Sequence, residues 1–202
     1  MTAPVRVVAL VDDPHARADI EDAIDQASDL ELLAGVTSSN ALWPILHEAR
    51  PRAIVLDLGG TGPANAELCL DIRRLFDPPE VVVYSSNVGH SGAVAAALAG
   101  AAAVFSRSTP PALVIDTLRA AVAGSRPRAE VPLTARSSAA LLLDPSDHPI
   151  FAMRLAGEGA ASIAQTLGLP CGAVVHRIRR IIAALETGVA RPERLAPAAG
   201  AS

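Results

Sequence analysis

The sequence predicts a five-stranded parallel, doubly wound α/β domain followed by a small all-α domain, and three observations support this division. Over the first 124 residues, five short apolar runs of strand length alternate with five helical patterns, as in chains built of strand–helix–strand units. From residue 134 onward only helical spacing is found. The charge also divides, because residues 1–128 hold ten Arg against fifteen acidic residues, whereas residues 129–202 hold seven Arg against six. Two units with different tasks are therefore expected.

Each expected strand of the α/β domain is an apolar run that a turn signal ends. Asp12 and Asp13 end the first strand, and Pro14 then suits the first position of a helix, where an N–H would have no partner. Glycines end the third strand, and Pro110 and Pro111 open the last helix. The expected strands are 5–11, 30–36, 53–58, 81–84 and 102–106, and the expected helices are 14–27, 39–49, 65–75, 91–99 and 110–124. Apolar strands of this kind are covered on both faces.

The second half is expected to be a linker, a helical domain and a tail. Residues 125–133 are rich in Pro and Arg and would join the α/β domain (1–124) to the helical domain (134–187). Four helices are expected there, at 134–143, 149–156, 160–167 and 171–186. Gly168 suits the left-handed position that reverses the chain before the last helix. The tail, 188–202, is rich in Ala, Pro and Gly and is expected to be disordered.

The composition excludes several classes of protein. Cys69 and Cys171 lie far apart in the sequence, so a disulfide framework is not expected and a reducing compartment is. The longest apolar stretch, 93–105, is too short to span a bilayer. We therefore expect a cytoplasmic protein without membrane contact. No nucleophile triad, phosphate-binding loop or zinc cluster is found in the sequence, so an enzyme is not expected.

Polar side chains follow four of the five expected strands. Asp12 and Asp13 end the first strand, Asp57 the third, Ser85 the fourth and Arg107 the fifth. In an open parallel sheet the carboxyl ends of the strands meet at one edge, where ligands bind. Converging carboxylates need a cation, and oxygen ligands suit Mg²⁺. A carboxylate held beside a hydroxyl and a cationic side chain can accept a phosphoryl group.

Residues 5–124 resemble the receiver domains of two-component response regulators, which have a flavodoxin-like fold. The resemblance is carried by Val-Asp-Asp-Pro-His at 11–15, Ile-Val-Leu-Asp-Leu at 54–58, Val-Val-Val-Tyr-Ser-Ser at 81–86 and the segment 99–107. It implies that Asp57 is the phosphoacceptor and Ser85 the switch residue. It also implies that Asp13, Asp57 and the backbone carbonyl of Gly59 ligate Mg²⁺ while Asp12 acts mostly through water, with a histidine kinase as the phosphoryl donor.

The receiver-like part departs from the family at three places. Arg107 stands where the family has Lys, Gly60 and Thr61 replace its Met-Pro, and Val104 replaces its switch aromatic. An Arg side chain is a rigid fork that favours bidentate pairing, whereas Lys is a point charge. Two modes stay open: Arg107 holds a phosphoryl group on Asp57, or it locks onto unmodified Asp57 and mimics the active state, so that the protein works independently of phosphorylation.

Residues 145–185 resemble the helix-turn-helix output domain of NarL/FixJ (LuxR-type) regulators, with 162–169 as support helix and turn and 173–182 as recognition helix. Apolar residues at helical spacing are expected to form a buried stripe: Ile163, Leu167, Val174, Ile178, Ile181 and Leu185. In such domains the recognition helix enters the major groove. We expect His176 and Arg179 to contact bases, and Arg177 and Arg180 to contact phosphates.

The sequence thus predicts a DNA-binding transcriptional regulator, acting as a homodimer, whose receiver-like domain controls dimerisation or exposure of the helix-turn-helix. Pro170, Cys171, Gly172 and Ala173 at the start of the recognition helix offer little hydrogen bonding to base edges. A second hypothesis is therefore a protein–protein adaptor that binds a sigma factor or another regulator. A third is a phosphate sink with only self-dephosphorylating activity.

Overall fold

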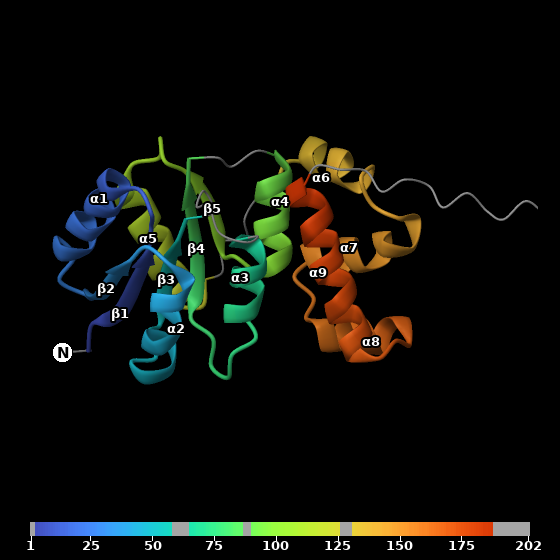
Figure 1. The fold of residues 1–202 in the computed structure, drawn as a ribbon, viewed down its shortest axis with the longest axis horizontal. Helices are drawn as coiled ribbons and strands as arrows, with labels where there is room; N and C mark the ends of the chain where they lie inside the picture. The colour runs from blue at the N-terminus through green and yellow to red at the C-terminus, as the bar shows by residue number, and fades with distance from the viewer. Residues whose placement is uncertain (1–2, 58–64, 87–89, 126–130, 188–202) are drawn as a thin grey trace, which may run out of the picture.

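The structure, a computed structural model, describes residues 3–57, 65–86, 90–125 and 131–187. Five strands alternate with five helices up to residue 122, and helices alone follow (Figure 1). The strands are β1 (Val5–Leu10), β2 (Leu30–Val36), β3 (Ala53–Leu56), β4 (Glu80–Ser85) and β5 (Ala103–Ser106). The helices between them are α1 (Pro14–Asp25), α2 (Ser39–Glu48), α3 (Asn65–Ile72), α4 (His90–Ala99) and α5 (Pro111–Val122). The predicted elements of this half are confirmed, with ends that differ by a few residues.

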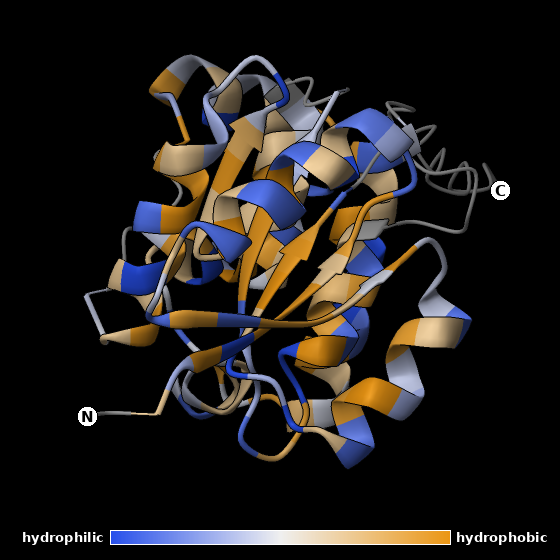
Figure 2. Ribbon diagram, turned by 90° about the vertical axis from the view of Figure 1, so that its left-hand side faces the viewer, coloured by the Kyte–Doolittle hydropathy of each residue, from blue (hydrophilic) through white to orange (hydrophobic). Residues whose placement is uncertain are grey.

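The five strands form one parallel sheet in the order β2-β1-β3-β4-β5. This order is flavodoxin-like, and it confirms the predicted doubly wound sheet. Alternate side chains of the strands enter two cores. One core packs α1 and α5 against the sheet, around Ile20, Ile24, Val114 and Leu118. The other packs α2, α3 and α4 on the opposite face. In Figure 2 the hydrophobic residues follow the central strands, and the hydrophilic residues lie mainly on the surrounding helices.

The C-terminal helices are α6 (Leu133–Ala140), the short 3-10 helix η1 (Pro145–Asp147), α7 (His148–Leu155), α8 (Ala160–Leu167) and α9 (Cys171–Thr187). Gly168 ends α8 in the left-handed conformation, with φ 65° and ψ 32°, so the chain reverses there as predicted. The expected buried stripe is confirmed except at Leu167, which is half-buried. Together α8, the turn and α9 form a helix-turn-helix.

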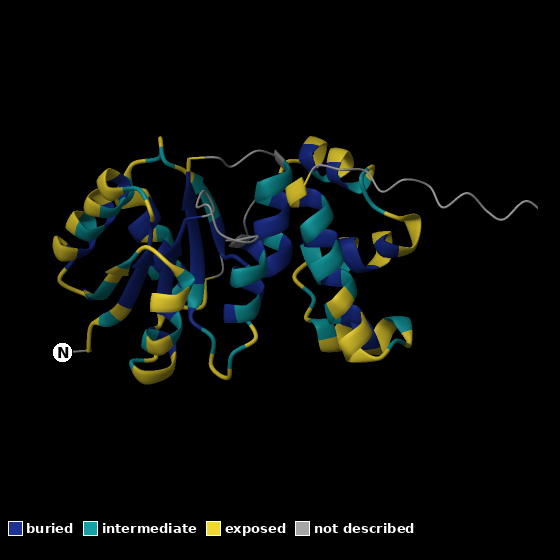
Figure 3. Ribbon diagram, in the orientation of Figure 1, coloured by how far each residue is buried: buried dark blue, intermediate teal, exposed yellow. Residues whose placement is uncertain are grey.

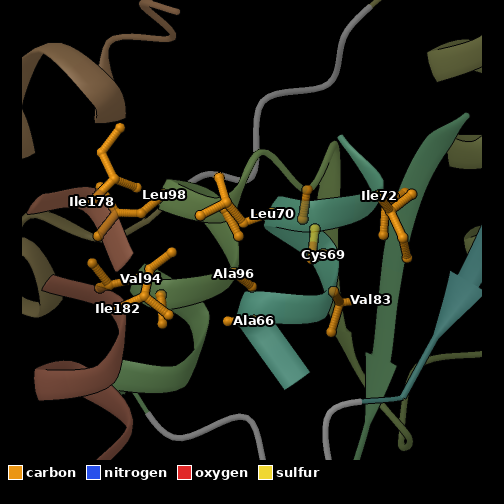
Figure 4. Packing of buried hydrophobic residues seen from close by; sticks show 14 of the residues in the cluster. Ala66, Cys69, Leu70, Ile72, Val83, Val94, Ala96, Leu98, Ile178 and Ile182 are labelled. Atoms are coloured by element: carbon orange, nitrogen blue, oxygen red, sulfur yellow. The ribbon is translucent and has the colours of Figure 1, made fainter. Parts of the chain in front are cut away.

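The helical part packs directly against the receiver-like part. Helix α9 lies along α4, and the two helices carry buried residues on their facing sides (Figures 1 and 3). Ile178 and Ile182 of α9 approach Leu98 and Val94 of α4, and all four belong to the same core cluster as the α3–α4 face of the sheet (Figure 4). Val131, in the expected linker, is buried in this cluster too. The two halves therefore share one core.

Some of the predictions lie outside the described residues: Gly59, the Gly60–Thr61 pair, most of the linker and the tail 188–202. Within the described part of the chain, no helix is long and apolar enough to cross a membrane.

Candidate functional site

The acidic residues at the strand ends come together around one arginine. Asp12 and Asp13 follow β1, Asp57 follows the neighbouring strand β3, and Arg107 follows β5. The Arg107 guanidinium lies 3.1 Å (Nη2) from Asp12 Oδ1 and 3.2 Å (Nη1) from Asp13 Oδ2. Its Nη2 also forms an ion pair with Asp57 Oδ2. Three carboxylates and one guanidinium thus form a single cluster, which we call the acidic pocket.

Asp13 also caps a helix. Its Oδ1 accepts a hydrogen bond of 2.8 Å from the backbone N–H of Ala16, in the first turn of α1. This bond, and then the charge of Arg107, hold the pKa of Asp13 below its usual range. Both oxygens of Asp13 are therefore engaged, one by the helix and one by Arg107.

Asp57 is the most buried acid of the pocket, at 4% exposed. Its neighbour Asp12 is more exposed, and the adjacent Asp57 carboxyl and then Arg107 hold the pKa of Asp12 below its usual range. The guanidinium, which contacts both carboxylates, offsets the repulsion between them.

The backbone on either side of Arg107 is fixed by β4. Its N–H donates to the carbonyl of Ser85 at 3.1 Å, and its own carbonyl accepts from the Tyr84 hydroxyl at 3.1 Å. Tyr84 and Ser85 are both buried. The predicted switch residue Ser85 thus lies beside the pocket, and the contacts with β4 fix the position of the Arg107 backbone.

The Mg²⁺ implied by the resemblance does not fit these residues. Among the described residues, no group of three or more His, Cys, Asp or Glu side chains is arranged to hold a metal ion. The oxygens of Asp12, Asp13 and Asp57 that would coordinate it face Arg107 instead. Mg²⁺ needs several oxygen ligands in near-octahedral geometry, and with the guanidinium in this position the three carboxylates do not offer that arrangement.

The four predicted DNA-binding residues are distributed over three sides of α9. His176 is exposed. Arg177 and Arg180 both turn toward Asp147 of η1, with Nε–Oδ1 2.6 Å and Nη2–Oδ2 2.7 Å respectively. Arg179 points the other way and pairs with Asp71 of α3. Because Asp147 is only 3% exposed, two cations satisfy a buried charge within the helical part.

Within the described ranges, polar contacts at three places join the helical part to the receiver-like part, and we call these contacts, with the α4–α9 packing, the docking interface. The first is the pair Arg179–Asp71. In the second, Nε of Arg154 on α7 donates to the carbonyl of Leu98, in the last turn of α4, at 2.7 Å. In the third, Oε1 of Glu186 on α9 accepts from the N–H of Ala66, in the first turn of α3, at 3.0 Å.

The last two contacts match the polarity of the helix ends. A cation lies at the carboxyl end of α4 and an anion at the amino end of α3, where the helix dipoles favour them. Burial lowers the pKa of Arg154 and raises that of Glu186, so both ions lose solvation on docking. The docking interface therefore pairs each ion with the helix end of opposite polarity, and forming it costs free energy because Arg154 and Glu186 lose water.

Comparison of the sequence with protein-family models and with curated proteins gives no match. Comparison of the structure with solved structures gives many. RcsB from Salmonella typhimurium, a response regulator, is 17% identical, with 92% of this chain and 93% of that chain covered and a TM-score of 0.58. A DNA complex of RcsB is 16% identical, with 90% and 92% covered and a TM-score of 0.58.

A LuxR-family response regulator from Aurantimonas sp. SI85-9A1 is 24% identical, with 64% of this chain and 91% of that chain covered and a TM-score of 0.57. The chain has the fold of a two-domain response regulator. The predicted fold class, a receiver domain followed by a helix-turn-helix domain, is thereby confirmed.

Within this response-regulator fold, the structure brings together every described residue that the sequence assigned to the acidic pocket. Sequence reasoning missed Asp147, Arg154 and Glu186. Asp147 follows a turn signal and looks like an ordinary helix-capping acid. Arg154 and Glu186 lie in helical patterns with nothing to distinguish them from solvent-facing charges. One signal was available: Ile182 extends the apolar stripe of α9 to a second face, which predicts a second packing partner.

Proposed function

We propose that the protein is a DNA-binding transcriptional regulator whose receiver-like domain (1–124) controls the exposure of its helix-turn-helix domain (134–187). One observation carries the proposal: a receiver fold is joined to a helix-turn-helix, and this combination is shared with the RcsB–DNA complex over 90% of the chain. The left-handed turn at Gly168 and the long helix that follows it agree with this function.

In this proposal α9 is the recognition helix. His176 and Arg179 read bases, and Arg177 and Arg180 contact phosphates while Asp147 orients them. Arg179 is held by Asp71 in the docked form, and the apolar residues Ile178 and Ile182 are covered by α4. DNA binding would therefore require the helical domain to leave the docking interface, and the free energy of docking sets how much of the protein can bind.

We propose a homodimer as the binding species, since the first residues of α9 offer little for base reading and a second copy would double the contact. A solved structure of two RcsB dimers bound to two parallel DNAs, 16% identical and with a TM-score of 0.57, supports this. A histidine kinase acting on Asp57 is the mode implied by the resemblance. The pairing of Arg107 with Asp57 favours the mode that does not depend on phosphorylation.

The second candidate function is a protein–protein adaptor. Cys171, Gly172 and Ala173 at the start of α9 are exposed and have no strong hydrogen-bonding side chain, which suits an apolar protein surface better than base edges.

Genomic footprinting of the intact protein tests the proposal, with His176→Ala as a variant and His15→Ala as its matched control. Both substitutions remove an exposed imidazole, but His15 lies on α1 of the receiver-like domain. We expect protected genomic sites for the wild type and the control, and weaker protection for His176→Ala. If no DNA is protected, the DNA-binding proposal fails and the adaptor function is favoured.

A further inference from the structure

The acidic pocket already contains a cation. The two terminal nitrogens of the Arg107 guanidinium contact Asp12, Asp13 and Asp57, so one side chain bridges three carboxylates from two strand ends. The guanidinium lies only 19% exposed while Asp57 is almost fully buried. The guanidinium is planar and carries several N–H donors in a fixed fork, so it can contact three carboxylates at once. A Lys ammonium is a compact point charge and lacks this fork.

The backbone that carries this cation is held by β4. The Arg107 N–H donates to the Ser85 carbonyl, and the buried Tyr84 hydroxyl donates to the Arg107 carbonyl. A guanidinium stays protonated in proteins, so the pocket contains a positive charge. The buried Nε–H of Arg107 has no hydrogen-bond partner within the described residues, so the three ion pairs also outweigh that cost.

Few carboxylate oxygens are left for a metal ion. One oxygen of Asp13 caps α1 and the other faces Arg107. One oxygen each of Asp12 and Asp57 also faces Arg107. A divalent ion would have to displace the guanidinium from these oxygens and remain close to a positive charge from which it is repelled.

We propose that Arg107 is the resident counter-ion of the acidic pocket in place of Mg²⁺, and that its presence prevents phosphoryl transfer to Asp57. A phosphoryl group arriving at Asp57 would meet an acceptor oxygen that is already ion-paired and would lack the metal that neutralises the transferring oxygens. The acidic pocket is then a fixed structural element. The activity of the protein is controlled at the docking interface instead, through the abundance of the protein, a ligand or a partner. The inference does not depend on whether α9 binds DNA.

Titration of the intact protein with MgCl2 tests the proposal, by calorimetry and by thermal unfolding. The wild type is expected to show neither saturable binding nor a rise in Tm at millimolar Mg²⁺. The variant Arg107→Ala frees the carboxylates and should gain Mg²⁺ binding and a Mg²⁺-dependent rise in Tm of a few degrees, as expected when an ion binds the folded state alone. The double variant Arg107→Ala/Asp57→Asn should lose that gain.

A second variant covers the case in which Arg107→Ala does not fold. Arg107→Lys keeps the charge but not the fork, and it should show the saturable Mg²⁺ binding that the wild type lacks. Incubation with acetyl phosphate and Mg²⁺, followed by peptide mass spectrometry, should show a phosphoryl adduct at Asp57 in Arg107→Lys and none in the wild type. Mg²⁺ binding or an Asp57 adduct in the wild type would overturn the proposal, as would failure of every folded Arg107 variant to bind Mg²⁺.

Discussion

Replacing Arg154 by Met tests the docking interface, because this loss of a positive charge should raise the affinity for DNA rather than lower it. Arg154 lies on α7, outside the proposed DNA-contacting helix, and its Nε donates to the Leu98 carbonyl of α4 across the interface. Loss of a positive charge normally weakens DNA binding. If docking hides α9, however, the variant should bind DNA more tightly, because the contact with the Leu98 carbonyl exists only in the docked form, whereas the contact of Arg154 with the Glu158 carbonyl lies within the helical domain and is lost in both forms.

The magnitude follows from the Leu98 carbonyl. In the docked variant this carbonyl would be left without its donor at a half-buried site, which costs about 1–3 kcal/mol. Part of that cost is offset, because the docked wild type also pays to desolvate the guanidinium, as the lowered pKa of Arg154 indicates. We therefore take the lower part of the range, about 1–2 kcal/mol, which corresponds to a gain in DNA affinity of roughly 5- to 30-fold where the docked form dominates.

The assay is fluorescence anisotropy on a duplex chosen by footprinting, with wild type, Arg154→Met and the charge-matched control Arg74→Met. Arg74 is exposed and lies on the receiver-like domain. The control should bind as the wild type does or slightly more weakly. An Arg154→Met protein that binds no more tightly than Arg74→Met would refute the reasoning that docking limits access to α9.

Three further outcomes are expected. Asp147→Asn should lower the free energy of unfolding by about 1–3 kcal/mol in urea titrations, since a buried carboxylate loses its charge while its two half-exposed arginine partners remain. An unchanged urea midpoint would show that the ion pairs of Asp147 with Arg177 and Arg180 do not stabilise the fold. Gly100→Ala should lower the free energy of unfolding by about 1 kcal/mol or more, because φ is 99° and the new Cβ would lie 3.1 Å from Arg154 Nη2. Gly172→Ala, with open space around it, should leave the free energy of unfolding unchanged or raise it by up to about 1 kcal/mol. Burial raises the pKa of Glu186 above its usual range, so the docked state binds a proton at this carboxyl more tightly than the undocked state does. Docking should therefore strengthen as pH falls through the raised pKa and weaken above it. Hydrogen exchange of α9 against pH measures the change in docking, and identical profiles for wild type and Glu186→Gln would contradict a role for Glu186.

Features that depend on local sequence were predictable. The apolar strands, the cap at Asp13 and the left-handed turn at Gly168 follow from neighbouring residues alone, and each is found. The convergence of Asp12, Asp57 and Arg107 was also predictable, because parallel strands bring their carboxyl ends to one edge.

Features that depend on how the two halves meet were not predictable in the same way. The polar spacing of Arg177, Arg179 and Arg180 places them off the buried stripe, but it does not say whether solvent, DNA or an acid lies opposite. The acids that bind them come from η1 and α3, 30 or more residues earlier in the chain. Only the folded arrangement shows that Asp147 and Asp71 bind these arginines.

The most direct measurement of the central claim is the affinity of the intact protein for its footprinted duplex over a range of salt concentrations, with Arg154→Met alongside. The account predicts that the logarithm of the association constant falls linearly with the logarithm of salt concentration, and that Arg154→Met binds more tightly than the wild type throughout. If neither protein binds DNA even at low salt, α9 is not a recognition helix and the account is contradicted.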